Sequence, residues 1–316
     1  SKPHGKGIYQ MTFLALQGTI ELGIIYAIMA LGVFLSFRTL NMPDLTVDSS
    51  FTLGAACSAV LAVAGHPWLG LMVAIGAGFI AGNVTALLHT KLKIQPLLAG
   101  ILVMLALYSV NLRVMGGRAN IPLINQTTIF DLLAGNDWGP LIITIAILII
   151  IMLLLFLFLQ TRFGLILRAT GDNDQMVRAI GGNTDFTILM GLAISNSLVA
   201  LSGAIIAQYQ SFTDISMGVG MVVIGLASVI IGEVIFGISS LFRRLLAVAL
   251  GAMVYRLVIA LAMEAGMPPT DMKLISALVV TVALSMPATR DYLMERKKRW
   301  IARPGGEGGS TDAKDR

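Results

Sequence analysis

The chain has 316 residues, of which 56% are hydrophobic and only 12% are charged, and its mean hydropathy is +0.85. A water-soluble domain carries about 25% charged residues, so this composition excludes an ordinary soluble protein. The formal net charge of +5 does not indicate nucleic-acid binding, because the basic residues gather at the ends of apolar runs and in the tail rather than on a soluble surface.

Apolar runs fill most of the chain. A membrane span needs about 20 apolar residues, and its backbone polar groups must be satisfied within a helix because lipid offers them no partner. We expect spans at 11–37, 50–64, 68–88, 95–115, 139–159, 187–209, 217–237, 243–263 and 273–288, of which the second and the last are short. The sequence therefore predicts an all-α, polytopic membrane protein with about 8–9 transmembrane helices.

We expect one membrane domain, residues 11–290, between an N-terminal tail, residues 1–10, and a basic, flexible tail, residues 291–316. Lys and Arg favour the cytoplasmic side of a membrane. The loops on one side are rich in them, as is the tail, whereas the other side holds only Lys2, Lys6, Arg113, Arg118 and Lys273. The rich side is therefore expected to be cytoplasmic, which places the N-terminus outside and the C-terminus inside.

A polar stretch interrupts the apolar sequence at 41–50. It contains Asp44, Thr46, Asp48 and Ser49 beside Pro43, and proline disfavours regular helix around it. Broken helices mark the binding site in many transporters, so these four residues are candidates for lining a translocation pathway. The alternative is that the carboxylates cap the helix that follows, and this is the favoured role for Asp48.

Further polar groups fall inside the expected spans. Glu21, Glu233 and Arg256 are ionisable, and such groups usually face a cavity or a partner. We place Glu21 on the pathway. The alternative for these residues is a pair between Arg256 and a carboxylate that fixes helix packing.

No sequence motif for an enzyme is present. The chain lacks a phosphate-binding G-x-x-x-x-G-K-[ST] loop, H-E-x-x-H and G-x-S-x-G, each of which carries a definite chemistry. Cys57 is the only cysteine, which excludes an intrachain disulfide. We predict no catalytic residue, metal or cofactor, so any ATP that drives the protein is bound by another chain.

The polar loop at 161–185 is too long for a simple turn between two spans, and long structured loops are usually functional. The sequence Thr170-Gly-Asp172 is interpreted as a break followed by a helix start, and 174–180 as a short helix closed by Gly181 and Gly182. We expect this helix to lie across the cytoplasmic face of the membrane.

The same loop carries a family resemblance. Thr161-Arg-Phe-Gly164, Arg168-Ala169 and Ala179-Ile-Gly-Gly-Asn-Thr184 resemble the cytoplasmic loop of permease subunits in bacterial ABC importers of the branched-chain amino acid, ribose and nucleoside permease family. The resemblance implies that 161–185 is the coupling loop, whose short helix seats in a groove of the ATPase. The residues implied in coupling are Gly171, Asp172, Asp174, Met176, Arg178, Gly181 and Asn183.

The N-terminal half narrows the resemblance. Ile25-Tyr-Ala-Ile-Met-Ala-Leu-Gly32 and Pro43-Asp-Leu-Thr-Val-Asp-Ser-Ser-Phe51 resemble the subgroup of tryptophan/tyrosine transporter permeases, whose signature reads F-x-x-L-T-V-D-G-S-F. Ser49 stands where that signature has glycine. The subgroup implies a small solute as substrate, an amino acid and in particular an aromatic one, or a related molecule.

Two hypotheses of function remain open on the sequence. The first, implied by the resemblance, is the permease of an ABC importer in the bacterial inner membrane. It works as a homodimer with a cytoplasmic ATPase dimer and an extracytoplasmic substrate-binding protein. The second is an ion-coupled secondary transporter that uses Asp44, Asp48 and Glu21. A secondary transporter has no need of a docking loop, which favours the first hypothesis.

Overall fold

The computed structural model describes residues 13–133, 135–266, 274–282 and 285. The expected N-terminal tail (1–10) and basic tail (291–316) lie outside the described residues.

Helices make up most of the described chain. They are α1 (Phe13–Val33), which continues as the π-helix η1 (Phe34–Thr39), α2 (Thr46–Val63), α3 (Pro67–Thr90), α4 (Pro96–Val114), the 3-10 helix η2 (Ile129–Leu133), α5 (Gly139–Gln160), α6 (Arg162–Asp172), α7 (Asp174–Ala179), α8 (Thr184–Gln210), α9 (Met221–Phe236) and α10 (Leu241–Glu264). Two short strands, β1 (Asn120–Pro122) and β2 (Phe212–Asp214), pair antiparallel.

The long helices begin where the sequence supplies a start signal. Prolines occupy the first positions of α3, α4 and α5, where the missing N–H has no helical partner in any case and the fixed φ suits a helix. The helices continue because nearly every residue is apolar and a helix satisfies its own backbone.

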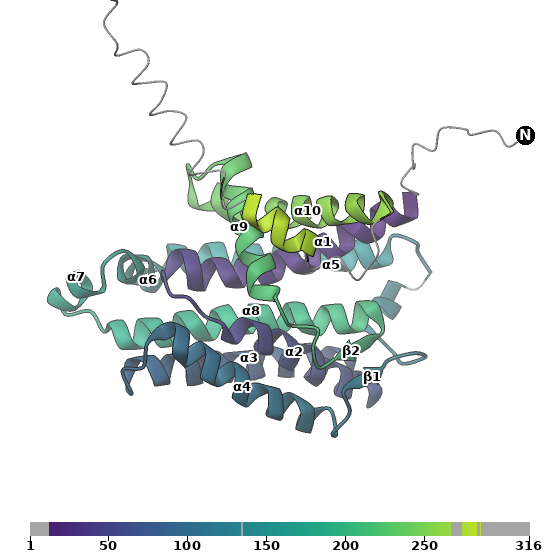
Figure 1. Ribbon diagram of the computed structural model, residues 1–316, viewed down its shortest axis with the longest axis horizontal. Helices are drawn as coiled ribbons and strands as arrows, with labels where there is room; N and C mark the ends of the chain where they lie inside the picture. Colours follow the sequence, from purple (N-terminus) through teal and green to yellow (C-terminus); the bar gives the residue numbers. More distant parts are fainter. Residues whose placement is uncertain (1–12, 134, 267–273, 283–284, 286–316) are drawn as a thin grey trace, which may run out of the picture.

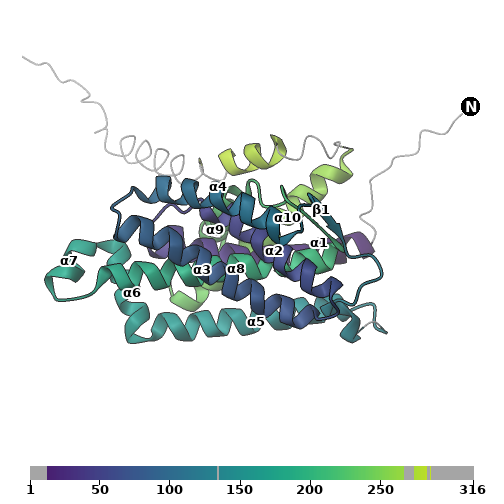
Figure 2. The same ribbon diagram turned by 90° about the horizontal axis from the view of Figure 1, so that it is seen from below.

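The long helices run roughly side by side, and α9 crosses them steeply (Figure 1). In both views α6 and α7 lie at one end of the bundle, here called the loop end, and β1 lies at the other, here called the ribbon end (Figure 2). Helices α1, α2 and α8 are mostly buried, whereas α3, α4 and α5 expose much of their apolar surface, as helices that face lipid do. The core of the protein therefore sits around α8.

Seven helices of the described residues are long and apolar enough to cross a membrane, and α9 is a shorter apolar helix. These eight correspond to the first eight expected spans. The second starts at Thr46 rather than at 50, and the seventh starts at Met221 rather than at 217. Of the ninth, 273–288, residues 274–282 are helical and most of the rest lies outside the described residues. The all-α, polytopic fold class is confirmed.

Candidate functional site

The chain is not helical at residues 40–45, between the end of η1 and the start of α2. This segment is here called the interruption. Asn41 has a left-handed φ of 54°, and Pro43 removes a backbone donor. Helix α2 begins at Thr46 because Asp44 supplies a partner for its first turn: the Asp44 Oδ1 accepts a hydrogen bond of 2.9 Å from the Thr46 N–H. The Asp44 Oδ2 accepts a second bond, of 2.7 Å, from the Asn196 side chain on α8. Asp44 is only 1% exposed, so both its oxygens are committed within the protein.

Asp48 caps a helix that starts far along the chain. Its carboxylate oxygens accept the N–H groups of Gly220, at 2.9 Å, and Val222, at 2.8 Å, which belong to the first turn of α9. The expectation that Asp48 caps the helix following the interruption is therefore wrong. A negative charge also stabilises a helix N-terminus electrostatically. Asp48 thus joins the start of α2 to the start of α9.

The backbones of α2 and the α9 start approach closely at this junction. Gly220 adopts a φ of +90°, which favours glycine. Gly218 has no room for a side chain, because a Cβ there would meet the carbonyl oxygen of Asp48. Two helix N-termini therefore meet inside the bundle.

Thr46 and Ser49 face neighbouring helices. The Thr46 hydroxyl lies 2.7 Å from the Thr85 hydroxyl on α3. The Ser49 hydroxyl donates a bond of 2.9 Å to the Met104 carbonyl on α4, and the Ser49 carbonyl accepts one of 3.1 Å from Asn111. Both side chains are buried. The structure thus gathers Asp44, Thr46, Asp48 and Ser49 at one place, each with a protein partner.

Glu21 lies elsewhere in the bundle. It is 4% exposed and accepts hydrogen bonds from Gln17, at 3.0 Å, and from the Tyr209 hydroxyl, at 2.7 Å. Tyr209 and Asn196, the partners of Glu21 and Asp44, are separated by about 20 Å along α8. The structure therefore does not bring Glu21 together with the interruption.

The ionisable residues of the later spans have definite partners. Arg256 lies over the ring of Tyr26, 5.5 Å from its centroid, a cation–π arrangement. The Glu233 carboxylate lies 3.0 Å from Arg38 of η1 and 3.8 Å from Arg244 of α10. The arginines that Glu233 contacts therefore differ from Arg256, the partner considered on the sequence.

The loop at 161–185 contains more helix than the sequence predicted. Residues Arg162–Asp172 form α6, which starts where the Thr161 hydroxyl accepts a bond of 3.1 Å from the Gly164 N–H. The interpretation of Thr170-Gly-Asp172 as a break is wrong, because these residues are the last turn of α6. The break is Asn173, which is extended and whose side chain caps α7 through the Met176 N–H at 3.0 Å. Asparagine is a strong N-cap residue, so this signal was present in the sequence.

Helix α7 ends close to where it was expected. Gly181 follows it with a φ of +86°, and the Gly182 N–H donates a bond of 2.9 Å to the Val177 carbonyl. Asn183 then caps α8, because its side chain accepts a bond of 3.1 Å from the Phe186 N–H.

Helix α7 projects from the loop end of the bundle (Figure 1). Its buried face is Val177, 2% exposed, while Met176 and Ile180 are 60% and 75% exposed. Arg178 lies 3.7 Å from Asp174 and 3.4 Å from Asp185 at the start of α8. Asp172 is exposed at the junction with α6. The helix is thus a short, braced element that presents two large apolar side chains.

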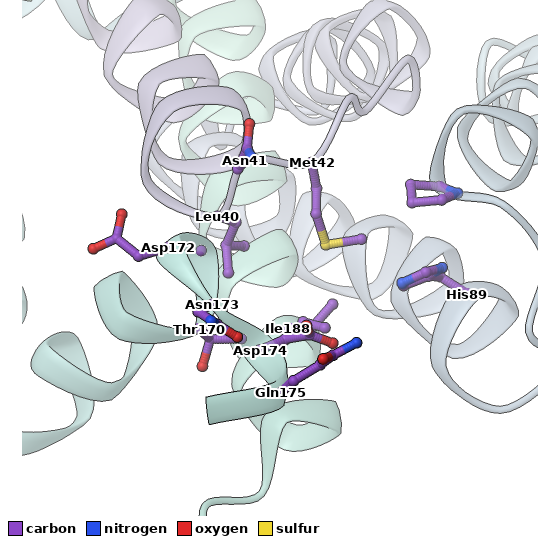
Figure 3. Close-up of a pocket in the computed structure, with 12 residues that line it drawn as sticks. Leu40, Asn41, Met42, His89, Thr170, Asp172, Asn173, Asp174, Gln175 and Ile188 are labelled. Atoms are coloured by element: carbon purple, nitrogen blue, oxygen red, sulfur yellow. The ribbon is translucent and has the colours of Figure 1, made fainter. Parts of the chain in front are cut away.

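The loop at 161–185 and the interruption meet at one pocket of about 340 Å³. Figure 3 shows Leu40 and Met42 extending toward the turn between α6 and α7, and Asn41 also lines this pocket. Beneath it, α6 and η1 touch through their backbones, because a Cβ on Gly171 would meet the carbonyl oxygen of Thr39. His89 completes the wall, with its Nδ1 2.8 Å from the Ile94 carbonyl. The two segments that the sequence singled out are therefore in contact.

Comparison with known proteins places this arrangement in a family. Residues 16–284 match the family described as branched-chain amino acid transport system / permease component. The chain is 42% identical over 263 residues to the tyrosine transport system permease protein of Clostridioides difficile (strain R20291), covering 83% of this chain and 88% of that protein. It is 26% identical over 269 residues to the galactofuranose transporter permease protein YtfT of Escherichia coli (strain K12), covering 84% of this chain and 76% of that one.

Among solved structures, the chain is similar to PsaBC from Streptococcus pneumoniae in complex with Fab, with a TM-score of 0.51 and 16% identity, covering 87% of this chain and 91% of that chain. That likeness concerns the fold alone. The relatives are transport components rather than enzymes, and such permeases work with ATPase and substrate-binding partners. The chain belongs to the branched-chain amino acid transport system / permease component family and is a multi-pass permease subunit of an ABC importer.

Proposed function

We propose that this permease imports an aromatic amino acid or a related small solute as a homodimer in the bacterial inner membrane. Each copy would dock on one subunit of a cytoplasmic ATPase dimer through α7 and receive the solute from an extracytoplasmic binding protein. The observation that carries the proposal is α7 itself, which projects from the bundle with Met176 and Ile180 exposed.

The geometry of α7 suits a docking element. Large apolar side chains at the centre of an interface contribute most when they enter a pocket on the partner. Arg178 lies near both Asp174 and Asp185, which ties α7 to the base of α8. Because these exposed ion pairs are individually weak, their role is to orient α7 rather than to stabilise the fold. Force on α7 would then pass to the helices behind it.

The substrate proposal rests on the relatives. The match to the tyrosine transport permease has 42% identity and covers 88% of that protein. The galactofuranose permease is more distant, at 26% identity. We therefore favour an aromatic amino acid over a sugar.

The pathway is proposed to pass beside the interruption and Glu21. Transporters bind solutes where broken helices leave N-termini inside the membrane, and the starts of α2 and α9 meet in this way. Asp44 and Asp48 are already bonded to N–H donors, which supports a shaping role for them over an ion relay. Glu21 lies apart from both, which argues against a relay through all three carboxylates.

Reconstitution tests the proposed function. Proteoliposomes that hold this chain, its ATPase and its binding protein should accumulate radiolabelled tyrosine or tryptophan only with ATP on the ATPase side. Collapse of the proton gradient should leave the uptake intact. Uptake in the absence of any ATPase would contradict the proposal, and binding of sugars but no amino acid to the binding protein would contradict its substrate.

A second experiment tests α7. Met176→Asp with Ile180→Asp should prevent the ATPase from co-purifying with the permease, because both charges would enter an apolar interface. Ile124→Asp is the matched control, since Ile124 is 70% exposed, close to the 75% of Ile180, but lies in the loop after β1 at the ribbon end. If the ATPase is recovered equally with the α7 variant and with Ile124→Asp, α7 is not part of the interface.

A further inference from the structure

Helix α9 is a short helix whose backbone packs closely against α10, because a Cβ on Gly232 would meet the carbonyl oxygen of Ala247. It has 16 residues and crosses the long helices steeply (Figure 1). Gly220 precedes it with a φ of +90° and Gly237 follows it with a φ of +77°, so the chain turns sharply at both ends. These glycine turns can absorb a change in backbone angles, so α9 can shift relative to α2 and η1 while it stays packed on α10.

Each end of α9 is held by a carboxylate. At its start, Asp48 of α2 accepts the N–H groups of Gly220 and Val222. Near its end, Glu233 contacts Arg38 of η1, with 3.0 Å between Oε1 and Nε, and Arg244 of α10 at 3.8 Å. The Glu233 side chain is 11% exposed and that of Arg38 51% exposed, so the pair is partly open to solvent and orients α9 more than it stabilises the fold. These contacts set where α9 sits relative to α2 and η1.

The contact with Arg38 connects α9 to the coupling loop. Arg38 lies in η1, and the next residue is Thr39. The Thr39 carbonyl contacts Gly171 of α6 so closely that a Cβ on Gly171 would have no space. Helix α6 leads directly into α7 through Asn173. A displacement of α7 therefore reaches η1 by backbone contact, and reaches α9 by the pair between Arg38 and Glu233.

The surroundings of this pair leave room for movement. A pocket of about 370 Å³ opens beside it, lined by Phe37, Arg38, Glu233 and aliphatic residues of α9. Close-packed interiors resist displacement, whereas α9 has free volume along the face that η1 would push. A π-helix, the form of η1, is rare and occurs frequently at functional sites.

We propose that Glu233 is a positioning residue for transport, which through Arg38 makes α9 follow the coupling loop and so opens or closes the junction at Asp48. The proposal rests on the proposed function, because it assigns the part of the permease that ATP-driven movement displaces. Glu233 contacts no solute in this role. It acts by holding α9 to η1.

The test measures uptake per ATP hydrolysed, in complexes purified through the permease so that every ATPase is attached to one. Glu233→Gln and Arg38→Gln should each lower this ratio about fivefold or more, which is the change that a typical coupling free energy produces. Arg38→Lys keeps the charge and should keep most of the ratio. Glu264→Gln is the matched control, since it removes a carboxylate from the opposite end of α10. A fall in the amount of folded complex lowers uptake and hydrolysis together and leaves the ratio unchanged.

The double variant decides whether the two residues act as a pair. If they do, Arg38→Gln with Glu233→Gln should be no worse than either single change, because each already breaks the contact. Two results would overturn the role of Glu233 while leaving the importer assignment intact. One is a double variant whose fold decrease is the product of the two single decreases, and the other is single variants with the wild-type ratio of uptake to hydrolysis. A wild-type complex without ATP-dependent uptake would overturn both. Arg38 is half exposed, so its variants remain informative if Glu233→Gln fails to assemble.

Discussion

The carboxylates of Asp44 and Asp48 stabilise the starts of two different helices. Asp44 bonds the first turn of α2 and the side chain of Asn196, whereas Asp48 bonds the first turn of α9. The structure separates their roles, because Asp44 precedes α2 and only Asp48 lies within it.

The contacts of Asp48 predict how its variants behave. Asn at position 48 keeps one acceptor oxygen, so Asp48→Asn should retain ATP-dependent uptake at a reduced level. Asp48→Ala leaves both N–H groups of α9 without a partner and should lower the free energy of unfolding by about 1–2 kcal/mol. Thermal unfolding of the purified protein and uptake by proteoliposomes measure the two effects. Loss of all uptake in a stable Asp48→Asn protein would instead indicate that the negative charge itself carries transport.

The burial of Thr46 makes its accessibility a probe of movement. Thr46 is buried against Thr85 in this structure, so a cysteine there should react slowly with a water-soluble thiol reagent. If the junction opens during transport, nucleotide should raise the rate. The background is Cys57→Ala, which removes the only native cysteine, and Ile124→Cys, in an exposed loop, is the control. A Thr46→Cys rate that is slow in every nucleotide state would mean that this segment stays packed.

At the scale of elements, the sequence predicted the apolar helices and the short helix α7, and it missed the amphipathic helix α6 and the short strands. Long runs of apolar residues allow few alternatives to a membrane helix. Helix α6 alternates arginine, glycine and apolar residues, which resembles a loop, and three-residue strands such as β1 carry too little pattern to detect. The cap of α9 could not be inferred, because Asp48 and Gly220 are separated by 172 positions and only the folded chain brings them together.

The packing of α6 on η1 predicts a sharp difference between two glycines. A Cβ on Gly171 would meet the Thr39 carbonyl, whereas Gly76 of α3 has open space around its Cβ position. Gly171→Ala should therefore displace α6 and reduce ATPase stimulation by the binding protein. Gly76→Ala should stabilise its helix by up to about 1 kcal/mol and leave stimulation unchanged. Stimulation assays and thermal unfolding of both variants check this, and full stimulation with Gly171→Ala would show that the contact is not part of coupling.

At the scale of the whole molecule, the two ends of the bundle differ in charge as well as in structure. The loop end carries η1, the loop at 161–185 and the start of α10, and with them Arg38, Arg178, Arg243 and Arg244. The ribbon end carries the β1–β2 pair, near which lie Arg113 and Arg118. The positive-inside rule therefore predicts that the loop end is cytoplasmic, which is also where an ATPase would meet α7.

This orientation can be measured in intact cells. In the Cys57→Ala background, Ile124→Cys at the ribbon end should react with a membrane-impermeant thiol reagent added outside. Asp172→Cys at the loop end should react only after the membrane is permeabilised, because both positions are exposed but lie at opposite ends of the bundle (Figure 1). The reagent reaches only the outer face of the membrane. Labelling of Asp172→Cys but not of Ile124→Cys in intact cells would therefore show that the protein has the opposite orientation. Helix α7 would then face away from ATP, and neither its docking role nor the connection through Arg38 to α9 could operate.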